Sequence, residues 1–340
     1  MNLALLEKWV PLRLLSSAGG PVVDWAYLGD ERFADPFFEQ TIAHCMNHPA
    51  NVLFRHQTPL DTLRRLCAER RGIAPTGFIF HMSRCGSTLV AQMLAAIERN
   101  IVISEARPID QVLQAAVDEE WRVEWLRWIV NALAQRRRTD EEYVFIKFDA
   151  WHVLHLPLIR RAFPNTPWVF LYRDPIEVLV SQQRERGVQV IPGALSPVLF
   201  GLDPREPWIT RLDEYAAQVL ARFCSAALEH CADGQGALMN FNELPHVVPD
   251  TLLKFFGVQY AAEEITRLRN AAGFDAKRPG LPYENDTMAK QRAASEELRS
   301  LCDRIVRPCY EQLESARVAQ SITLAPRRVA PEGSSRASSR

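Results

Sequence analysis

One stretch, residues 77–94, constrains the fold of this 340-residue chain more than any other. Its first six residues are mostly apolar and have the length of a short buried strand. The next residues are small or polar, and from Ser87 onward the apolar positions follow the period of a helix. This order predicts a strand, a tight loop and a helix, which is the repeating unit of an α/β protein with a parallel sheet.

The loop at residues 83–88 is suited to hold a phosphate-like anion. The first N–H groups of a helix have no partner inside the helix and carry a partial positive charge, so they attract anions. Gly86 lets the backbone approach a ligand closely, and Ser87 and Thr88 add hydroxyl donors. The Gly-Lys-Ser/Thr ending of ATP-binding P-loops is absent, and the cation of the loop, Arg84, precedes the glycine.

Short apolar runs and longer helical patterns alternate along most of the chain. They predict an α/β fold, a P-loop-like three-layer sandwich in which helices flank a mostly parallel central sheet. The expected strands are Gly77–Met82, Ile101–Ser104, Tyr143–Lys147, Trp168–Tyr172 and Ala237–Phe241. Helices are expected to begin near Ser87, Ile109, Trp121, Leu154, Pro175, Asp213, Val248, Ala262 and Ala289.

Composition divides the chain into three parts. Residues 76–320 are expected to form the α/β domain, and residues 1–75 an N-terminal accessory region whose role the sequence leaves open. Residues 187–210 are rich in Gly and Pro, and a long irregular insert of this kind is often a lid or binding loop. The Ser- and Arg-rich residues 325–340 are expected to be a disordered tail.

A second strand-to-helix junction follows the run at residues 168–172. It delivers Arg173, whose planar fork of donors suits a phosphate, to the carboxyl end of a strand. Asp174 is expected to cap the following helix, with Pro175 in its first turn and Glu177 completing a capping box. Ser181 adds a hydroxyl further along that helix. Two such junctions suit a molecule that carries two separated phosphate-like groups.

Bulk properties narrow the choice of partners and compartment. The net charge of −1, from 40 basic and 41 acidic residues, gives no reason to expect a nucleic acid or an anionic membrane as partner. The seven cysteines are scattered and odd in number, which predicts reduced thiols and a cytoplasmic protein. We expect neither a signal peptide nor a membrane span.

The order of four motifs resembles the sulfotransferases that use 3′-phosphoadenosine 5′-phosphosulfate (PAPS). The loop at 83–89 resembles their 5′-phosphosulfate loop, and residues 172–181 resemble their 3′-phosphate motif. Residues 239–244 and the basic segment at 277–280 are weaker matches in the expected order. Together the motifs cover about residues 76–315. Cys85 stands where the family usually has serine, and Ser83 where it has proline; both still permit a loop of small residues.

The resemblance implies PAPS as co-substrate and adenosine 3′,5′-bisphosphate as product, without a metal. The donor-binding residues that it implies are Ser83, Arg84, Cys85, Gly86, Ser87, Thr88, Arg173, Ser181, Lys277 and Arg278. Cys85 is expected to be a small packing residue of the loop, with a reactive thiol as the alternative, because helix N-termini lower thiol pKa values.

Sulfuryl transfer needs a base for the acceptor proton and cations on the sulfonate oxygens. Glu105, after the strand at 101–104, is the first candidate base, because some sulfotransferases use a glutamate at a similar place. Asp149 is the second, since it stands where cytosolic members carry a catalytic histidine that this chain lacks. Arg84 and Lys147 are expected to assist at the sulfonate.

The sequence thus predicts a sulfotransferase that acts on a hydroxyl or amine of a small molecule or peptide. It leaves the oligomeric state open, with a homo-oligomer as one option. Two alternatives stay open. One is a P-loop kinase that uses ATP and Mg²⁺, with Asp174 as a metal ligand. The other is an inactive member of the fold that only binds the nucleotide. His152 and His155 resemble a metal pair but lack further ligands at a suitable spacing, so no metal site is expected.

Overall fold

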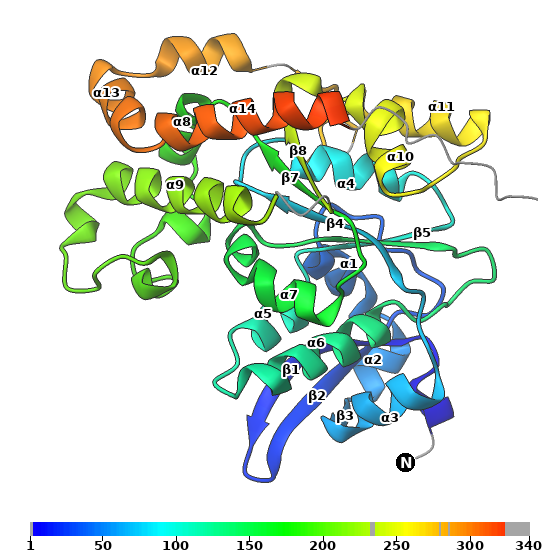
Figure 1. The fold of residues 1–340 in the computed structure, drawn as a ribbon. Coiled ribbons are helices and arrows are strands. Elements are labelled where there is room, and N and C mark those ends of the chain that lie inside the picture. The colour runs from blue at the N-terminus through cyan, green and yellow to red at the C-terminus, as the bar shows by residue number, and fades with distance from the viewer. Residues whose placement is uncertain (1–2, 232–234, 279, 285, 324–340) are drawn as a thin grey trace, which may run out of the picture.

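The computed structural model describes residues 3–231, 235–278, 280–284 and 286–323 (Figure 1). A parallel sheet of five strands forms its centre, in the order β5-β6-β4-β7-β8. These strands are β4 (Pro75–His81), β5 (Asn100–Ser104), β6 (Tyr143–Lys147), β7 (Trp168–Tyr172) and β8 (Gly236–Asn240). All five expected strands are therefore present, and the predicted fold class is confirmed.

The strand order places the first strand of the sheet in its middle. From β4 the chain moves outward to β5, returns to β6 beside β4, and then crosses to β7 on the other side of β4. Ligands of such sheets bind outside the carboxyl ends of the strands, where the direction of winding reverses. The end of β4 is that point here, and the loop at 83–88 follows it directly.

Helices cover both faces of this sheet. In Figure 1, α4, α11 and α14 lie above the sheet, and α5, α6 and α7 lie below it. The helices after the first sheet strand are α4 (Ser87–Ala95), α5 (Arg107–Leu113), α6 (Glu119–Leu133), α7 (Leu156–Ala162), α8 (Pro175–Arg184), α9 (Leu212–His230), α10 (Leu253–Phe255), α11 (Ala262–Ala271), α12 (Thr287–Ala293), α13 (Glu296–Ile305) and α14 (Arg307–Thr323). A 3₁₀ segment, η2 (Ala150–His155), precedes α7, and η7 (Phe241–Glu243) and the π-helical turn η8 (Val248–Leu252) follow β8.

The central strands are apolar because they are covered on both faces. Every residue of β5, β7 and β8 is buried, which explains why these runs are continuous rather than alternating. Phe80 stacks on Phe148 at 4.6 Å between ring centroids, and the ring of Trp168 meets the edge of Phe80 at 6.0 Å. These contacts fix the end of the sheet that carries the loop.

The first seventy-five residues contribute a second, antiparallel sheet. After η1 (Leu3–Leu6) its strands are β1 (Trp9–Ser17), β2 (Gly20–Tyr27) and β3 (His56–Pro59), and its helices are α1 (Phe38–Cys45), α2 (Pro49–Leu53) and α3 (Asp61–Glu69). The side-chain amide of Gln111, on α5, exchanges two hydrogen bonds with the backbone of Leu14, at 2.8 and 2.9 Å. The buried side chains of this region are continuous with those around the central sheet.

The insert at residues 187–210 is not an open loop along its length. It contains three short 3₁₀ helices, η3 (Val188–Val190), η4 (Pro197–Phe200) and η5 (Trp208–Thr210). The side chains of Val190, Phe200 and Trp208 are buried, and the last two meet Tyr215 of α9 through their rings. These side chains anchor the insert to the core, while most of its other residues are exposed.

Other expectations concern the tail, the thiols and the membrane. The tail predicted at 325–340 lies outside the described residues. All seven cysteines are free thiols, as their spacing predicted. Among the helices of the described segments, none combines the length and the apolar character that a membrane crossing requires.

The contact between Gly236 and Trp168 gives a test of core packing. A Cβ added at Gly236 would lie 2.3 Å from Cζ2 of the fully buried Trp168, so we expect Gly236→Ala to lower the free energy of unfolding by about 1–3 kcal/mol. Gly19→Ala is the control, because a Cβ there meets nothing within 4 Å. Urea denaturation of both variants checks this, and equal midpoints would contradict the packing.

Candidate functional site

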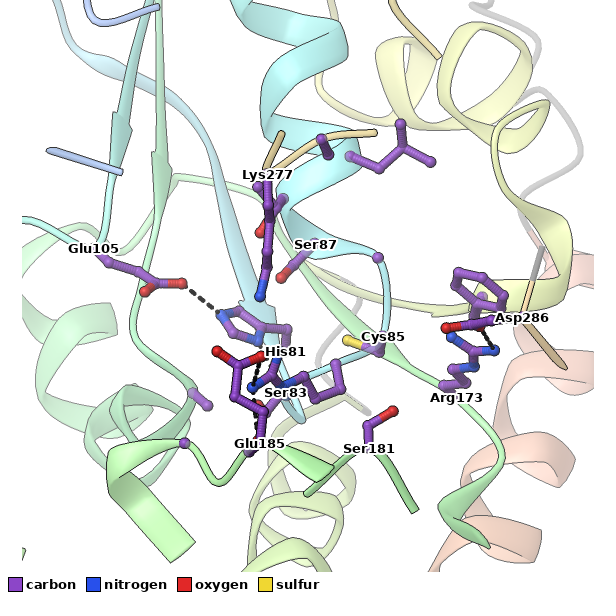
Figure 2. A pocket seen from close by; sticks show the side chains of 18 of the residues that line it. His81, Ser83, Cys85, Ser87, Glu105, Arg173, Ser181, Glu185, Lys277 and Asp286 are labelled. Atoms are coloured by element: carbon purple, nitrogen blue, oxygen red, sulfur yellow. Dashed lines mark hydrogen bonds and ion pairs between the residues drawn. The ribbon is translucent and has the colours of Figure 1, made fainter. Parts of the chain in front are cut away.

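A cavity of about 750 Å³ lies at the carboxyl ends of the central strands (Figure 2). It is lined by the loop at 83–88, by Glu105 and Asp149 after β5 and β6, by Arg173 after β7, and by Lys277. The sequence-predicted residues Ser181 and Arg278 line the same cavity. Of the predicted site residues, Lys147 alone is absent from the lining; it lies directly behind Glu105, to which its ammonium group is bonded.

The loop after β4 has an unusual backbone. Ser83 and Arg84 have φ of +73° and +52°, and Gly86, which precedes α4, has φ of +83°. Left-handed conformations of non-glycine residues cost free energy and cluster at functional sites. No side-chain hydrogen bond caps α4 in the described part of the chain, so its first N–H groups face the cavity as an anion seat.

Gly86 is required for steric reasons as well as for its φ. A Cβ at this position would lie 2.7 Å from Cδ1 of Leu244 and 3.0 Å from the ring of Phe241. Both side chains come from the segment after β8, the weaker of the motifs in the sequence. The segment after β8 therefore packs closely against the backbone of the loop at Gly86.

Arg84 spans the mouth of the loop. Its guanidinium donates to the backbone oxygen of Glu185 at 2.7 Å and pairs with the Glu185 carboxylate at 3.0 Å. The Glu185 side chain is 79% exposed, so this pair is weak and solvent-accessible. An anion in the cavity can therefore compete for Arg84 at little cost.

Cys85 is a packing residue of the loop. Its side chain is fully buried, and its thiol donates to the backbone oxygen of Leu171 at 3.0 Å. Burial raises the pKa of the Cys85 thiol to about 12, which outweighs the lowering by nearby backbone groups. At neutral pH the group is a thiol and not a reactive thiolate.

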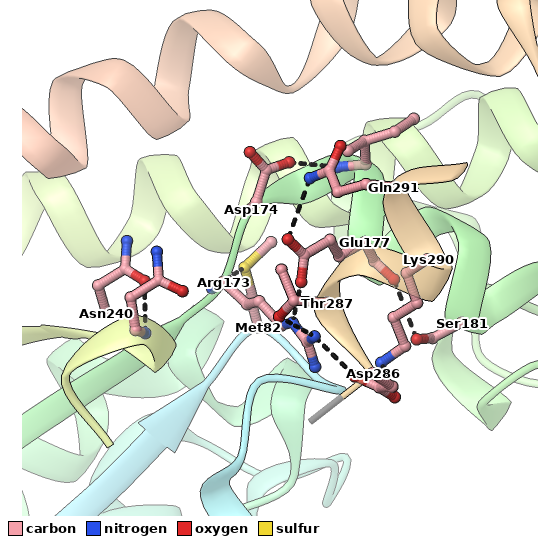
Figure 3. Close-up of polar contacts among 12 residues, drawn as sticks. Met82, Arg173, Asp174, Glu177, Ser181, Asn240, Asp286, Thr287, Lys290 and Gln291 are labelled. Carbon is pink, nitrogen blue, oxygen red and sulfur yellow. Dashed lines mark hydrogen bonds and ion pairs between the residues drawn. The ribbon is translucent and has the colours of Figure 1, made fainter. Parts of the chain in front are cut away.

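Arg173 already holds two carboxylates (Figure 3). Its Nε donates to Glu177 at 2.6 Å, and one terminal nitrogen donates to Asp286 at 2.7 Å and to the hydroxyl of Thr287 at 3.1 Å. The ring of Phe241 lies 3.9 Å from its guanidinium carbon. The arginine is 4% exposed, so its charge is held by these partners and is not screened by water.

The expectation of a capping box at α8 was wrong in one part. Asp174 does cap the helix, accepting from the N–H of Ile176 at 3.0 Å, and it pairs with Arg307 of α14 at 3.1 Å. Glu177, however, turns to Arg173 and accepts from Gln291 at 3.0 Å. An adjacent buried arginine attracts a carboxylate more strongly than a backbone N–H does.

The start of α12 completes this part of the site and was missed in the sequence. Lys290, one turn into the helix, is buried and pairs with Asp286 at 2.7 Å. Asp286 therefore lies between two cations, Arg173 and Lys290, as an anionic ligand would. The signal in the sequence was an acidic residue followed four positions later by lysine at the start of a helix, a common pattern with little specificity.

Ser181 lies on α8 beside this cluster. Its hydroxyl donates to the backbone oxygen of Glu177 at 2.9 Å and lines the cavity. Lys277 approaches the loop from the opposite side, next to Ser87 in Figure 2. Burial lowers the pKa of the Lys277 ammonium, and the nearby charge of Arg84 lowers it further. Arg278 is 71% exposed and pairs with Asp275 at 2.8 Å, so it lies at the rim.

Phe37 brings the N-terminal region to the cavity. Its ring lies 5.0 Å from the ammonium nitrogen of Lys147 and 5.8 Å from that of Lys277. A ring face attracts cations at this distance. The sequence around Phe37 carries no signal that this ring would face the site.

Glu105 is bound by two basic side chains. The Lys147 ammonium donates to its carboxylate, and Nε2 of His81 lies 3.4 Å from Oε1. Burial alone would raise the pKa of Glu105, but the charge of Lys147 and the hydrogen bond from His81 hold it well below its usual range. Its backbone has φ of +55°, which makes it the third non-glycine residue of the site in a left-handed conformation, after Ser83 and Arg84.

Asp149 has the opposite electrostatic environment. Burial raises its pKa to about 7; His152 opposes this shift, and the charges of Glu105 and Asp110 reinforce it. A carboxylate whose pKa lies near neutrality can accept a proton and release it again at physiological pH. The two candidate bases therefore differ: Glu105 stays ionised, and Asp149 titrates.

Asp110, Asp149 and His152 form the one group of potential metal ligands found among the described residues. The geometry argues against a metal. Nδ1 of His152 accepts from the N–H of Asp149 at 3.2 Å, so its proton is on Nε2, which donates to Asp110 at 2.8 Å. A metal on Nε2 would leave the ring without a proton on either nitrogen.

No family model matches the sequence, and no curated protein resembles it closely enough to count as a match. Several solved structures share its general arrangement. A sulfotransferase from Alicyclobacillus acidocaldarius is 16% identical over 72% of this chain and 96% of its own, with a TM-score of 0.43. The sulfotransferase domain of the curacin biosynthetic pathway is 16% identical over 72% and 98%, with a TM-score of 0.42. A retinol dehydratase, solved with retinol and PAP, is 12% identical over 75% and 89%, with a TM-score of 0.39.

The raised pKa of Asp149 predicts a pH-dependent stability. A carboxyl whose pKa is higher in the folded state contributes stability below its unfolded pKa, near 4, and loses it as the pH rises through about 7. We expect Asp149→Asn to exceed the parent protein in stability at pH 8, by on the order of 2–4 kcal/mol, and to match it near pH 4.

Denaturation curves at both pH values check this expectation. Glu263→Gln is the control, because this carboxylate is exposed in the first turn of α11 and should change stability by less than about 0.5 kcal/mol at either pH. An Asp149→Asn variant that is less stable than the parent protein at pH 8 would contradict the assigned environment.

Proposed function

We propose that this protein is a sulfotransferase that moves a sulfonate group from PAPS to a hydroxyl or amine of its acceptor and releases adenosine 3′,5′-bisphosphate. The observation that carries this proposal is that two anion-binding junctions, after the adjacent strands β4 and β7, open into one cavity whose lining includes the two candidate bases, Glu105 and Asp149. One ligand with separated phosphate groups can use both junctions, and the carboxylates lie where an acceptor would be activated.

The donor would be held at two points. The N-terminal turn of α4, with the hydroxyls of Ser87 and Thr88, suits the phosphosulfate end. Arg173 and Lys290 suit the 3′-phosphate, which would take the place of the Asp286 carboxylate between them. Ser181 lines the cavity at the same end, and Lys277 lies over the loop from the opposite side.

In the transfer step, the acceptor oxygen or nitrogen forms a bond to sulfur while the bond from sulfur to the bridging phosphate oxygen breaks. The acceptor proton passes to Asp149. The loop amides stabilise the negative charge on the leaving phosphate, and the nearby positive charge of Lys147 adds to this stabilisation. Glu105 holds the Lys147 side chain in place. Thus Asp149 becomes the preferred base, although the sequence favoured Glu105.

The kinase alternative receives less support from the geometry. Asp174, its proposed metal ligand, is engaged by the N–H of Ile176 and by Arg307, and it does not line the cavity. The loop offers arginine in place of the lysine that ATP-binding P-loops use. The alternative of an inactive binding protein predicts donor binding without any turnover, so the tests below separate it.

Titration calorimetry with adenosine 3′,5′-bisphosphate tests the donor site. We expect saturable binding that AMP does not reproduce, because AMP lacks the 3′-phosphate. Arg173→Ala should weaken binding about 10- to 100-fold by removing a charged donor. Asp286→Asn should tighten it about three- to tenfold, since the competing internal carboxylate is gone while Arg173 stays. Equal binding of AMP, or weaker binding by Asp286→Asn, would overturn this assignment.

Turnover of PAPS with a panel of hydroxyl and amine acceptors tests the base. If Asp149 takes the proton, activity should rise with pH through about 7, and Asp149→Asn should lower kcat by about 100-fold or more. Glu105→Gln should lower kcat less and should keep an acid limb that moves to lower pH, because the charge of Glu105 raises the pKa of Asp149. A pH profile that loses its acid limb only in Glu105→Gln would assign the base to Glu105 instead.

A further inference from the structure

A buried histidine, His81, links the two halves of the site. It is the last residue of β4 and is 5% exposed, yet its ring lines the cavity (Figure 2). No role was predicted for His81, because it stands at the end of an apolar run. Its two ring nitrogens face different partners, and this arrangement assigns each nitrogen a separate task.

The Nδ1 atom holds the anion-binding loop. It accepts a hydrogen bond from the backbone N–H of Ser83 at 3.0 Å, two residues along the chain. Ser83 has φ of +73°, a conformation that costs free energy and persists only when neighbouring groups hold it. The hydrogen bond from Ser83 supplies such a restraint at the first residue of the loop.

The Nε2 atom faces the acceptor side. It lies 3.0 Å from the backbone oxygen of Phe148, the residue before Asp149, and 3.4 Å from Oε1 of Glu105. A backbone N–H can only donate, so Nδ1 carries no proton, and the proton of the neutral ring is on Nε2. The ring thus donates to Phe148 and points at Glu105 in one defined tautomer.

Burial of the ring favours its neutral form. Burial lowers the pKa of His81; the hydrogen bond to Glu105 opposes this, and the ammonium of Lys147 lowers the pKa again. Protonation would also place a second hydrogen between Nδ1 and the N–H of Ser83 and so break the restraint on the loop. The neutral form is therefore the one that fits both contacts.

We propose that His81 is a positioning residue for sulfuryl transfer, which couples the loop that seats the donor to the strand ends that carry Glu105 and Asp149. Nδ1 fixes the loop through Ser83, and Nε2 fixes the acceptor side through Phe148 and Glu105. The kinetic and binding effects rest on the proposed function, whereas the tautomer stands on the structure of the site alone.

Two substitutions separate the nitrogens. In His81→Asn the side-chain oxygen lies near the place of Nδ1 and can still accept from Ser83, but nothing reaches Phe148. In His81→Gln the longer amide reaches toward the place of Nε2 and can donate to Phe148, but the bond from Ser83 is lost. His81→Phe removes both contacts and keeps a ring of similar size.

We expect a split between binding and turnover. His81→Gln should weaken binding of adenosine 3′,5′-bisphosphate about fivefold and raise the KM for PAPS similarly, with kcat changed less. His81→Asn should keep binding within twofold and lower kcat about 10- to 100-fold, because the acceptor side is displaced. His81→Phe should show both losses. His56→Gln, in the three-stranded sheet, is the control and should show neither.

Nitrogen NMR of the histidine-labelled protein gives a readout that needs no activity. The signals of His81, assigned by their loss in His81→Gln, should show an unprotonated Nδ1 and a protonated Nε2 from pH 6 to 8. The opposite tautomer, a doubly protonated ring, or identical losses in His81→Asn and His81→Gln would overturn the proposal. If the parent protein binds no bisphosphate, the proposed function is wrong. The tautomer measured by NMR then still tests the hydrogen bonds assigned to His81.

Discussion

The pairing of a fully buried lysine with a carboxylate governs the architecture of this site. Lys147 ends β6 with no exposed surface, and Glu105, after β5, is its bonded partner. An unpaired charge at such a place costs several kcal/mol, so the two residues must stay together. The cost shows in the backbone: Glu105 has φ of +55°, and its N–H donates to the Lys147 oxygen at 2.7 Å.

This pair divides the carboxylates of the cavity into two kinds. Glu105 is held ionised by Lys147, and its negative charge helps to raise the pKa of Asp149. Glu105 therefore stays ionised near neutral pH, whereas Asp149 gains and loses its proton there. Neighbouring carboxylates whose environments separate their pKa values are a common basis for assigning different chemical roles.

A second theme is that cations of the cavity carry internal partners. Arg173 is paired with Glu177 and Asp286, Lys290 with Asp286, and Arg84 with Glu185. An anionic ligand would therefore exchange with carboxylates of the protein itself. The affinity for such a ligand is then a difference between two sets of charge pairs.

The sequence by itself determined the sheet and the two junctions. Continuous apolar runs predict buried parallel strands, and the pattern that predicts each strand lies within a few residues. The patterns that predict the loop at 83–88 and the cap at Asp174 are equally short. The five strands were therefore predictable to within two residues at either end. The loop residues that line the cavity could be named for the same reason.

Only the tertiary structure decided which charges meet. Glu177 turned from the expected capping box to Arg173. Asp286 bonds to that arginine from more than one hundred positions along the chain, and Lys290 pairs with Asp286. Phe37 and His81 joined the cavity without any local signal. The pKa values of Glu105 and Asp149 depend on burial and on neighbours from other strands. Such quantities are set by distances in space, which a pattern along the chain does not encode.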